Sequence, residues 1–126
     1  MAYGIEHIHI IAEDPRRSAR WWAETFGAEI LPERKDGSML FAPVLLGGVK
    51  INISTPRPDG DAGPPAPLPH YGLEHLGIRV DDIRRTLRVF EEQGLEIYER
   101  KRTPIYEIAF VAGPDGVCLE LMQPLG

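Results

Sequence analysis

Two segments of the chain, residues 5–12 and 73–80, alternate apolar and polar positions and are rich in β-branched side chains. This alternation is typical of a half-buried strand, so we expect one strand in each segment. Each strand is followed by a stretch of helical periodicity. Its apolar positions are Ala19, Trp22 and Phe26 in the first stretch and Ile83, Leu87 and Phe90 in the second. Because these positions share one face, each helix is expected to cover a sheet.

Capping residues mark where both helices begin and end. Asp14 precedes Pro15, a pairing typical of a helix N-terminus, and Gly27 stands where a left-handed C-cap is needed. Asp82 and Gly94 repeat the arrangement around the second helix. Three further strands are expected after each helix, near 28–32, 38–46 and 49–55 and then near 95–100, 105–112 and 117–122.

The two halves of the chain are copies of one unit. A shift of 68 residues aligns EHIHIIAEDPRRSAR, which starts at Glu6, with EHLGIRVDDIRRTLR, which starts at Glu74. The same shift aligns VKINISTP, from Val49, with VCLELMQP, from Val117. Register held across a whole unit indicates an internal repeat. We therefore predict an α+β protein with two tandem βαβββ modules that form an open, cupped, mixed sheet with the helices outside.

A proline-rich linker separates the two modules. Residues 56–71 hold half of the twelve prolines in the chain, so no regular element is expected there. The first module would span about 1–55 and the second about 72–126. A chain of 126 residues has the size of one ordinary domain, and we expect a single domain.

The expected strands give each polar side chain a definite face. Residues two apart in a strand share a face, so His7 lies beside His9 in the first module. By the same rule His75 shares a face with Gly77 and Arg79 in the second. In the last strand Val117, Leu119 and Leu121 form an apolar face toward the helix, which sends Glu120 to the opposite face. The repeat makes Asn52 the counterpart of Glu120.

Four equivalent positions are expected to converge if the two modules pack around a pseudo-twofold axis. These positions are His7, Asn52, His75 and Glu120. Two imidazoles and one carboxylate with open positions suit a catalytic divalent metal, namely Zn, Ni, Co, Mn or Fe(II). The amide of Asn52 is a weak neutral ligand that either binds the metal, orients a water or does neither. We predict a divalent-metal site.

Charge and hydrophobicity argue against a nucleic-acid or membrane partner. The net charge of −5 and the pI near 5.3 argue against nucleic acid, which requires a basic face. No apolar run is long enough to cross a membrane, and the N-terminus has no signal-peptide pattern. The one cysteine, Cys118, cannot form an intrachain disulfide and is expected to be a small buried apolar residue. We expect a cytoplasmic protein with a small-molecule substrate and no membrane partner.

Three segments resemble the vicinal oxygen chelate superfamily, which includes glyoxalase I, methylmalonyl-CoA epimerase, extradiol dioxygenases and fosfomycin or bleomycin resistance proteins. They are EHIHIIAED, EHLGIRVDD and GPDGVCLELMQP. The resemblance implies metal ligands at His7, Asn52, His75 and Glu120, and frequent homodimers, so we expect a homodimer. Glyoxalase I has a carboxylate where this chain has Asn52, whereas methylmalonyl-CoA epimerase has an amide there.

The resemblance implies an enzyme that isomerises a small carbonyl substrate through a metal-stabilised enolate. Glu120 is the candidate catalytic acid/base, with Lys50 and Glu33 as weaker alternatives. A non-haem Fe(II) dioxygenase of the extradiol type is a second hypothesis, since it needs only two histidines and one carboxylate. A drug-binding resistance protein is a third. The candidate pocket residues are His9, Lys50, Arg79, Tyr106 and Phe110.

Overall fold

The computed structural model describes residues 2–60 and 62–126, and the chain folds into two compact units, Met1–Gly63 and Pro64–Gly126. The boundary between the units falls inside the proline-rich linker. Among the described residues between Ser54 and His75 there is neither helix nor strand, as the prolines predicted. Asp61 of the predicted linker lies outside the described residues.

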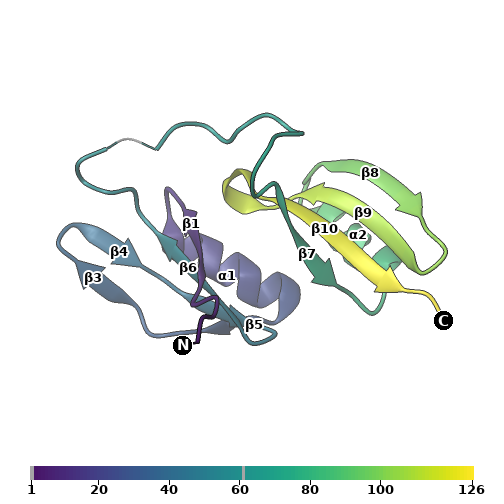
Figure 1. The fold of residues 1–126 in the computed structure, drawn as a ribbon, viewed down its shortest axis with the longest axis horizontal. Helices are drawn as coiled ribbons and strands as arrows, with labels where there is room; N and C mark the ends of the chain where they lie inside the picture. The colour runs from purple at the N-terminus through teal and green to yellow at the C-terminus, as the bar shows by residue number, and fades with distance from the viewer. Residues whose placement is uncertain (1, 61) are drawn as a thin grey trace. The chain divides into compact units, whose positions relative to one another are not determined.

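The first unit is a mixed sheet with one helix (Figure 1). Its elements are β1 (Ile8–Ile11), α1 (Pro15–Phe26), β2 (Glu29–Ile30), β3 (Arg34–Asp36), β4 (Met39–Phe41), β5 (Val44–Leu46) and β6 (Val49–Ser54). The strand order is β2-β5-β6-β4-β3, and β1 pairs with β6 in parallel. Helix α1 packs on β2, β5 and β6.

The second unit has the predicted βαβββ order. Its elements are β7 (His75–Arg79), α2 (Ile83–Glu92), β8 (Ile97–Arg102), β9 (Tyr106–Ala112) and β10 (Cys118–Pro124), with a 3₁₀ turn at Pro114–Gly116. The sheet order is β7-β10-β9-β8, and β7 pairs with β10 in parallel while the other pairs are antiparallel. Helix α2 packs on β8, β9 and β10 (Figure 1). The α+β class is confirmed, with the strands of the described residues in two mixed sheets, one in each unit.

Both helices begin where the sequence predicted. The side chain of Asp14 accepts a hydrogen bond from the backbone N–H of Arg17, and Asp82 accepts one from Arg85. Helix α1 ends at Gly27, whose φ of 74° is the left-handed conformation that glycine adopts without a Cβ clash. Gly94 has a φ of 71° just beyond α2. The caps therefore set the length of each helix.

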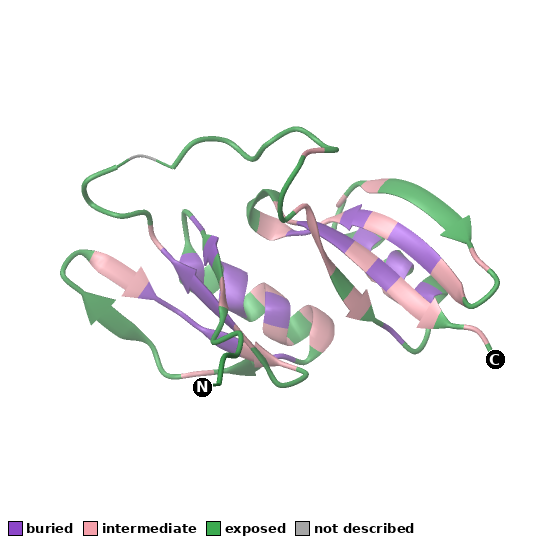
Figure 2. Ribbon diagram, viewed as in Figure 1, coloured by how far each residue is buried: buried purple, intermediate pink, exposed green. Residues whose placement is uncertain are grey.

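The core of each unit lies between its helix and its sheet. Trp22 of α1 and Ile53 of β6 are fully buried in the first unit, and Phe90, Leu119 and Leu121 in the second. Over residues 109–112 of β9 and 119–122 of β10 buried positions alternate with half-buried ones, because successive side chains point to opposite faces (Figure 2). Glu120 is thereby excluded from the face that meets α2. Neither helix is long and apolar enough to cross a membrane.

The repeat extends to the register of strand pairing. His9 is the Cα partner of Asn52 in the pair β1–β6, and Gly77 is the partner of Glu120 in the pair β7–β10. The separation is 43 residues in both pairs (52 − 9 and 120 − 77). Asn52 and Glu120 therefore occupy equivalent positions in their sheets.

The first module departs from the predicted strands in two places. The expected strand at 38–46 is divided into β4 and β5, because Pro43 cannot donate a ladder hydrogen bond. Residues 34–36 form β3, which the sequence did not predict. Strand β1 is also shorter than expected and begins at Ile8, so His7 lies just before its first residue.

Candidate functional site

In the second unit the structure brings His75 and Glu120 together. Nε2 of His75, near the start of β7, lies 3.4 Å from Oε1 of Glu120 on β10. Both side chains are largely shielded, with 32% and 15% of their surfaces exposed. Leu119 and Leu121 are buried against α2, and this forces Glu120 onto the same face of the sheet as His75. The pairing predicted from the strand pattern is thus present.

The other ring nitrogen of His75 is held by Glu74. Nδ1 of His75 lies 2.9 Å from Oε1 of Glu74, and this hydrogen bond is the main reason that the pKa of the Glu74 carboxyl is lowered. An ionised carboxylate can only accept, so Nδ1 carries the proton. In the neutral imidazole Nε2 is then the free acceptor, and it faces Glu120.

The first unit contains the same carboxylate–imidazole pair. Nδ1 of His7 lies 2.7 Å from Oε1 of Glu6. This hydrogen bond, and then the nearby ammonium of Lys50 at 3.9 Å, lower the pKa of the Glu6 carboxyl. Nε2 of His7 is therefore the acceptor nitrogen, as in His75. Lys50, a predicted pocket residue, is an ion-pair partner of Glu6 in this unit.

His9 has a different tautomer, which its neighbours decide. Its Nε2 lies 2.7 Å from the hydroxyl of Ser54, and that hydroxyl donates its own hydrogen to the carbonyl of Thr55. Ser54 can therefore only accept from His9, so Nε2 of His9 carries the proton. Burial, followed by electrostatic interactions with the His7 ring and the guanidinium groups of Arg57 and Arg34, lowers the pKa of His9. A neutral His9 thus keeps Nδ1 as its acceptor.

The two units differ in the residue that lies opposite the acid or the amide on the neighbouring strand. Gly77 faces Glu120, and a methyl group built on Gly77 would lie 3.7 Å from Oε1 of Glu120. In the first unit His9 faces Asn52, which is 5% exposed. The residue opposite the carboxylate therefore has no side chain, whereas the residue opposite the amide is a histidine.

The remaining predicted pocket residues lie on the second unit. The ring of Phe110, whose Cα partner is Glu120, is 5.2 Å from the ring of His75 in an edge-to-face arrangement. Tyr106 lies four residues earlier on the same face of β9, opposite Pro124. Arg79 is exposed and lies opposite Met122. Phe110 is therefore the one of the three that contacts a predicted ligand.

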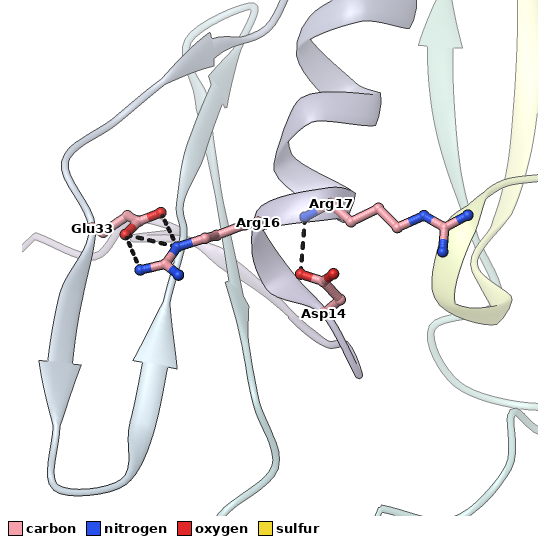
Figure 3. Close-up of polar contacts among 4 residues, drawn as sticks. All are labelled: Asp14, Arg16, Arg17 and Glu33. Atoms are coloured by element: carbon pink, nitrogen blue, oxygen red, sulfur yellow. Dashed lines mark hydrogen bonds and ion pairs between the residues drawn. The ribbon is translucent and has the colours of Figure 1, made fainter.

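Glu33, the other weaker alternative for the base, forms an ion pair with a residue of α1. Arg16 of α1 donates from Nε to both carboxylate oxygens of Glu33, at 3.1 and 2.9 Å, and from a terminal nitrogen at 2.9 Å (Figure 3). This forked pair lowers the pKa of the Glu33 carboxyl, and desolvation opposes it only in part. The pair with Arg16 stabilises the ionised form of Glu33, and its role as an alternative base stays a prediction.

Each unit thus contributes two of the four predicted ligands. Within residues 2–60 and 62–126, no three His, Cys, Asp or Glu side chains gather into a metal-holding group. Sequence reasoning missed Glu6, Glu74 and Ser54 as partners of the histidines. The first two had a signal, since both glutamates recur in register immediately before the repeated histidines. Ser54 had none, because it lies 45 residues from His9.

The family of the chain is shown by comparison with known proteins. Residues 4–121 match the family model described as the glyoxalase/bleomycin resistance protein/dioxygenase superfamily. The chain belongs to this superfamily. The match spans residues of both units, and the resemblance seen in the three sequence segments is confirmed.

Individual relatives are distant. The chain is 24% identical to glyoxalase I of Saccharomyces cerevisiae over 143 aligned residues, covering 94% of this chain and 44% of that protein. It therefore spans under half of that relative's length. A glyoxalase family protein from Bacillus cereus has a similar fold, with a TM-score of 0.86, 17% identity and coverage of 100% and 97% of the two chains.

A fosfomycin resistance protein, FosX, from Listeria monocytogenes also has this fold. The TM-score is 0.72 at 19% identity, with coverage of 97% of this chain and 93% of that one. That protein was solved as a mutant in complex with Mn(II) and a dihydroxypropylphosphonic acid. Members of this fold thus include a protein that binds both a divalent metal and a small organic molecule.

Proposed function

We propose that the protein is a divalent-metal-dependent enzyme that isomerises a small carbonyl substrate, with His7, Asn52, His75 and Glu120 as metal ligands. Superfamily membership supports the class, since glyoxalase I is a distant relative and FosX was solved with Mn(II). The observation that carries the proposal is the spacing of His75 and Glu120.

That spacing fits two ligands of one ion. Ligand atoms about 2.0–2.2 Å from one zinc ion lie roughly 2.8–3.6 Å apart in tetrahedral or octahedral geometry. Nε2 of His75 and Oε1 of Glu120 are 3.4 Å apart. His75 also has its Nδ1–H directed to the carboxylate of Glu74, the outer partner that metal-binding histidines commonly have. His7 and Glu6 repeat this feature in the first unit.

The chemistry follows from these groups. When bound, a divalent cation supplies Lewis-acid stabilisation of negative charge on a substrate oxygen. Glu120 is proposed to take a proton from the carbon beside the carbonyl, which leaves an enolate. The same carbon then regains a proton from water on its opposite face, while Glu120 releases its own proton to solvent, so no net proton is consumed. Phe110 lies beside His75 and excludes water from one side of the site.

A second candidate is a non-haem Fe(II) dioxygenase of the extradiol type. The observation that favours it is the amide at Asn52, which leaves two histidines and a single carboxylate as the strong donors. Oxygen consumption with catechol that depends on added Fe(II) would favour this reaction. Exchange of substrate C–H hydrogen with solvent deuterium, without oxygen uptake, would favour the isomerase.

The metal proposal is tested by elemental analysis of the purified protein after exposure to Zn, Ni, Co, Mn or Fe(II). We expect about one equivalent of metal in the wild type and its loss in His7→Ala, His75→Ala and Glu120→Gln, with unchanged circular dichroism. Glu96→Gln is the matched control for Glu120→Gln, because Glu96 is an exposed carboxylate outside the proposed ligand set. Equal metal content in the His75→Ala variant and the wild type would remove the proposal.

A further inference from the structure

The second unit contains a pocket of about 700 Å³, and Phe110, one of the candidate pocket residues, lines it. One wall is the end of the linker, residues 65–69. The opposite wall consists of side chains of the sheet and its edges, namely Glu74, Tyr98, Glu99, Phe110 and Cys118. Pockets of about 300–1,000 Å³ are the size that holds small organic ligands.

Three residues that line the pocket are also neighbours of His75. Phe110 contacts the His75 ring, Glu74 accepts its Nδ1–H, and Cys118 is the Cα partner of His75 on β10. A ligand in the pocket therefore lies against the imidazole that the proposed function assigns to the metal. That the pocket holds the organic group of the substrate rests on that proposed function. That the pocket binds a ligand at all does not depend on it.

The walls favour a flat apolar group. The linker wall is rich in proline, and the sheet wall presents the rings of Tyr98 and Phe110. Proline rings have few conformations to lose, so closing this wall over a ligand costs little entropy. Aromatic rings attract other rings in offset or edge-to-face geometry. The lining thus suits an aromatic or similarly flat group.

The charge of the lining argues against an anion. Glu74 and Glu99 line the pocket, and among the described residues that line it there is no lysine or arginine. The ammonium of Lys101 lies 5.7 Å from the centre of the Phe110 ring, but Lys101 does not line the pocket. A carboxylate or phosphate placed between Glu74 and Glu99 would face like charge.

The linker packs closely against the sheet at Gly116. Gly116, with a φ of 74°, packs directly against the Pro65 ring, and a Cβ at this position would overlap it. A side chain at Gly116 would therefore push the linker away from the sheet. Gly37 has a comparable φ of 60°, with no described atom within 4 Å of a Cβ built there. An alanine at either glycine strains the backbone, but only an alanine at Gly116 also displaces Pro65, so the two variants separate these effects.

We propose that this pocket between residues 65–69 and the strands β8 and β9 binds the aromatic part of a ligand that carries no negative charge. The pocket selects against anionic substrates such as acyl-CoA thioesters or phosphonates. A neutral or cationic aryl carbonyl compound is the substrate class that fits it.

The test uses three probes that share one ring system: 2-naphthylmethanol, 2-naphthylmethylamine and 2-naphthoate. Binding to the full chain is measured by calorimetry and by NMR shifts, once with excess chelator and once with metal. The alcohol and the amine are expected to bind at least about ten-fold more tightly than the carboxylate in both conditions. Tighter binding of 2-naphthoate in the presence of chelator would overturn the proposal.

Variants locate the binding site. Phe110→Ala and Gly116→Ala are expected to weaken binding of 2-naphthylmethanol by about ten-fold or more, while Tyr3→Ala and Gly37→Ala leave it unchanged. Tyr3 is 88% exposed and lies in the first unit. Unchanged binding in both pocket variants would place the probe elsewhere and overturn the proposal. If the protein takes up no metal but binds the probes as expected, the proposed function is contradicted and this inference is supported.

Discussion

Gly77 faces Glu120 across the strands β7 and β10, and a methyl group on Gly77 would lie 3.7 Å from Oε1 of Glu120 and 3.6 Å from the sulfur of Met122. These are ordinary van der Waals distances, so the position beside the carboxylate accepts a methyl group without a clash. We expect Gly77→Ala to bind metal as the wild type does. Gly77→His is expected to weaken binding by about ten-fold or more, because the larger ring must displace the Glu120 side chain.

Metal titration against a chromophoric chelator measures this difference. The first unit supplies the natural comparison, since His9 occupies the place of Gly77 and faces an amide instead of an acid. If Gly77→His and Gly77→Ala bind metal equally well, the free space beside Glu120 has no part in metal binding.

Glu74 is predicted to act through His75. Glu74→Gln removes the charge from the group that accepts the Nδ1–H of His75, so metal affinity is expected to fall by about 10- to 100-fold. The ¹⁵N shifts of the imidazole report the tautomer independently of affinity. Glu96→Gln, a change of the same kind at an exposed site, is the control. Equal affinity and an unchanged tautomer in Glu74→Gln would contradict the role of Glu74.

Ser54 is predicted to stabilise the fold through His9. Ser54→Ala removes the fully buried hydroxyl that accepts from Nε2 of His9, which costs about 1–2 kcal/mol in the free energy of unfolding. Thermal unfolding should shift downward by roughly 4–8 °C for each kcal/mol in a unit of this size. Ser38→Ala, at an exposed position, should leave the melting temperature where it was. A Ser54→Ala variant as stable as the wild type would mean that water replaces the lost acceptor.

Cys118 is predicted to be an unreactive thiol. It is 5% exposed, and burial, followed by the negative charges of Glu74 and Glu120, raises its pKa. The thiolate is the reactive form, so at neutral pH a disulfide reagent should label the folded protein far more slowly than the unfolded protein. The rate should rise with pH up to values above the usual thiol pKa. Fast labelling at neutral pH in native buffer would show that the thiol is accessible and ionised.

At the start of α1, the N-cap Asp14 is expected to contribute more to the free energy of unfolding than the surface ion pair of Arg16 with Glu33. Asp14→Ala removes the acceptor for the Arg17 N–H and should cost about 1 kcal/mol in the free energy of unfolding. Glu33→Ala removes the exposed partner of Arg16, and the melting temperature should not change measurably, because water solvates both charges. Chemical denaturation of both variants checks the contrast (Figure 3). A larger loss at Glu33 would mean that the forked pair anchors α1 to the segment before β3.

Much of this protein can be read from its sequence because the information is local and repeated. Alternation and helical spacing predicted the strands and helices of the second module, and Asp14, Gly27 and Asp82 predicted helix ends. The repeat of 68 residues was enough to identify His75 and Glu120 as the equivalents of His7 and Asn52. Strand alternation then placed Glu120 on the face away from α2, where it meets His75.

Tertiary structure decided what depends on contacts between distant segments. The hydrogen bond between His9 and Ser54 and the placement of Gly77 beside Glu120 both depend on strand register. The pocket depends on where the linker packs, and prolines specify stiffness but not a docking site. Local spacing in the sequence therefore determined which residues face the same way, and only the packed sheet determined which atoms touch.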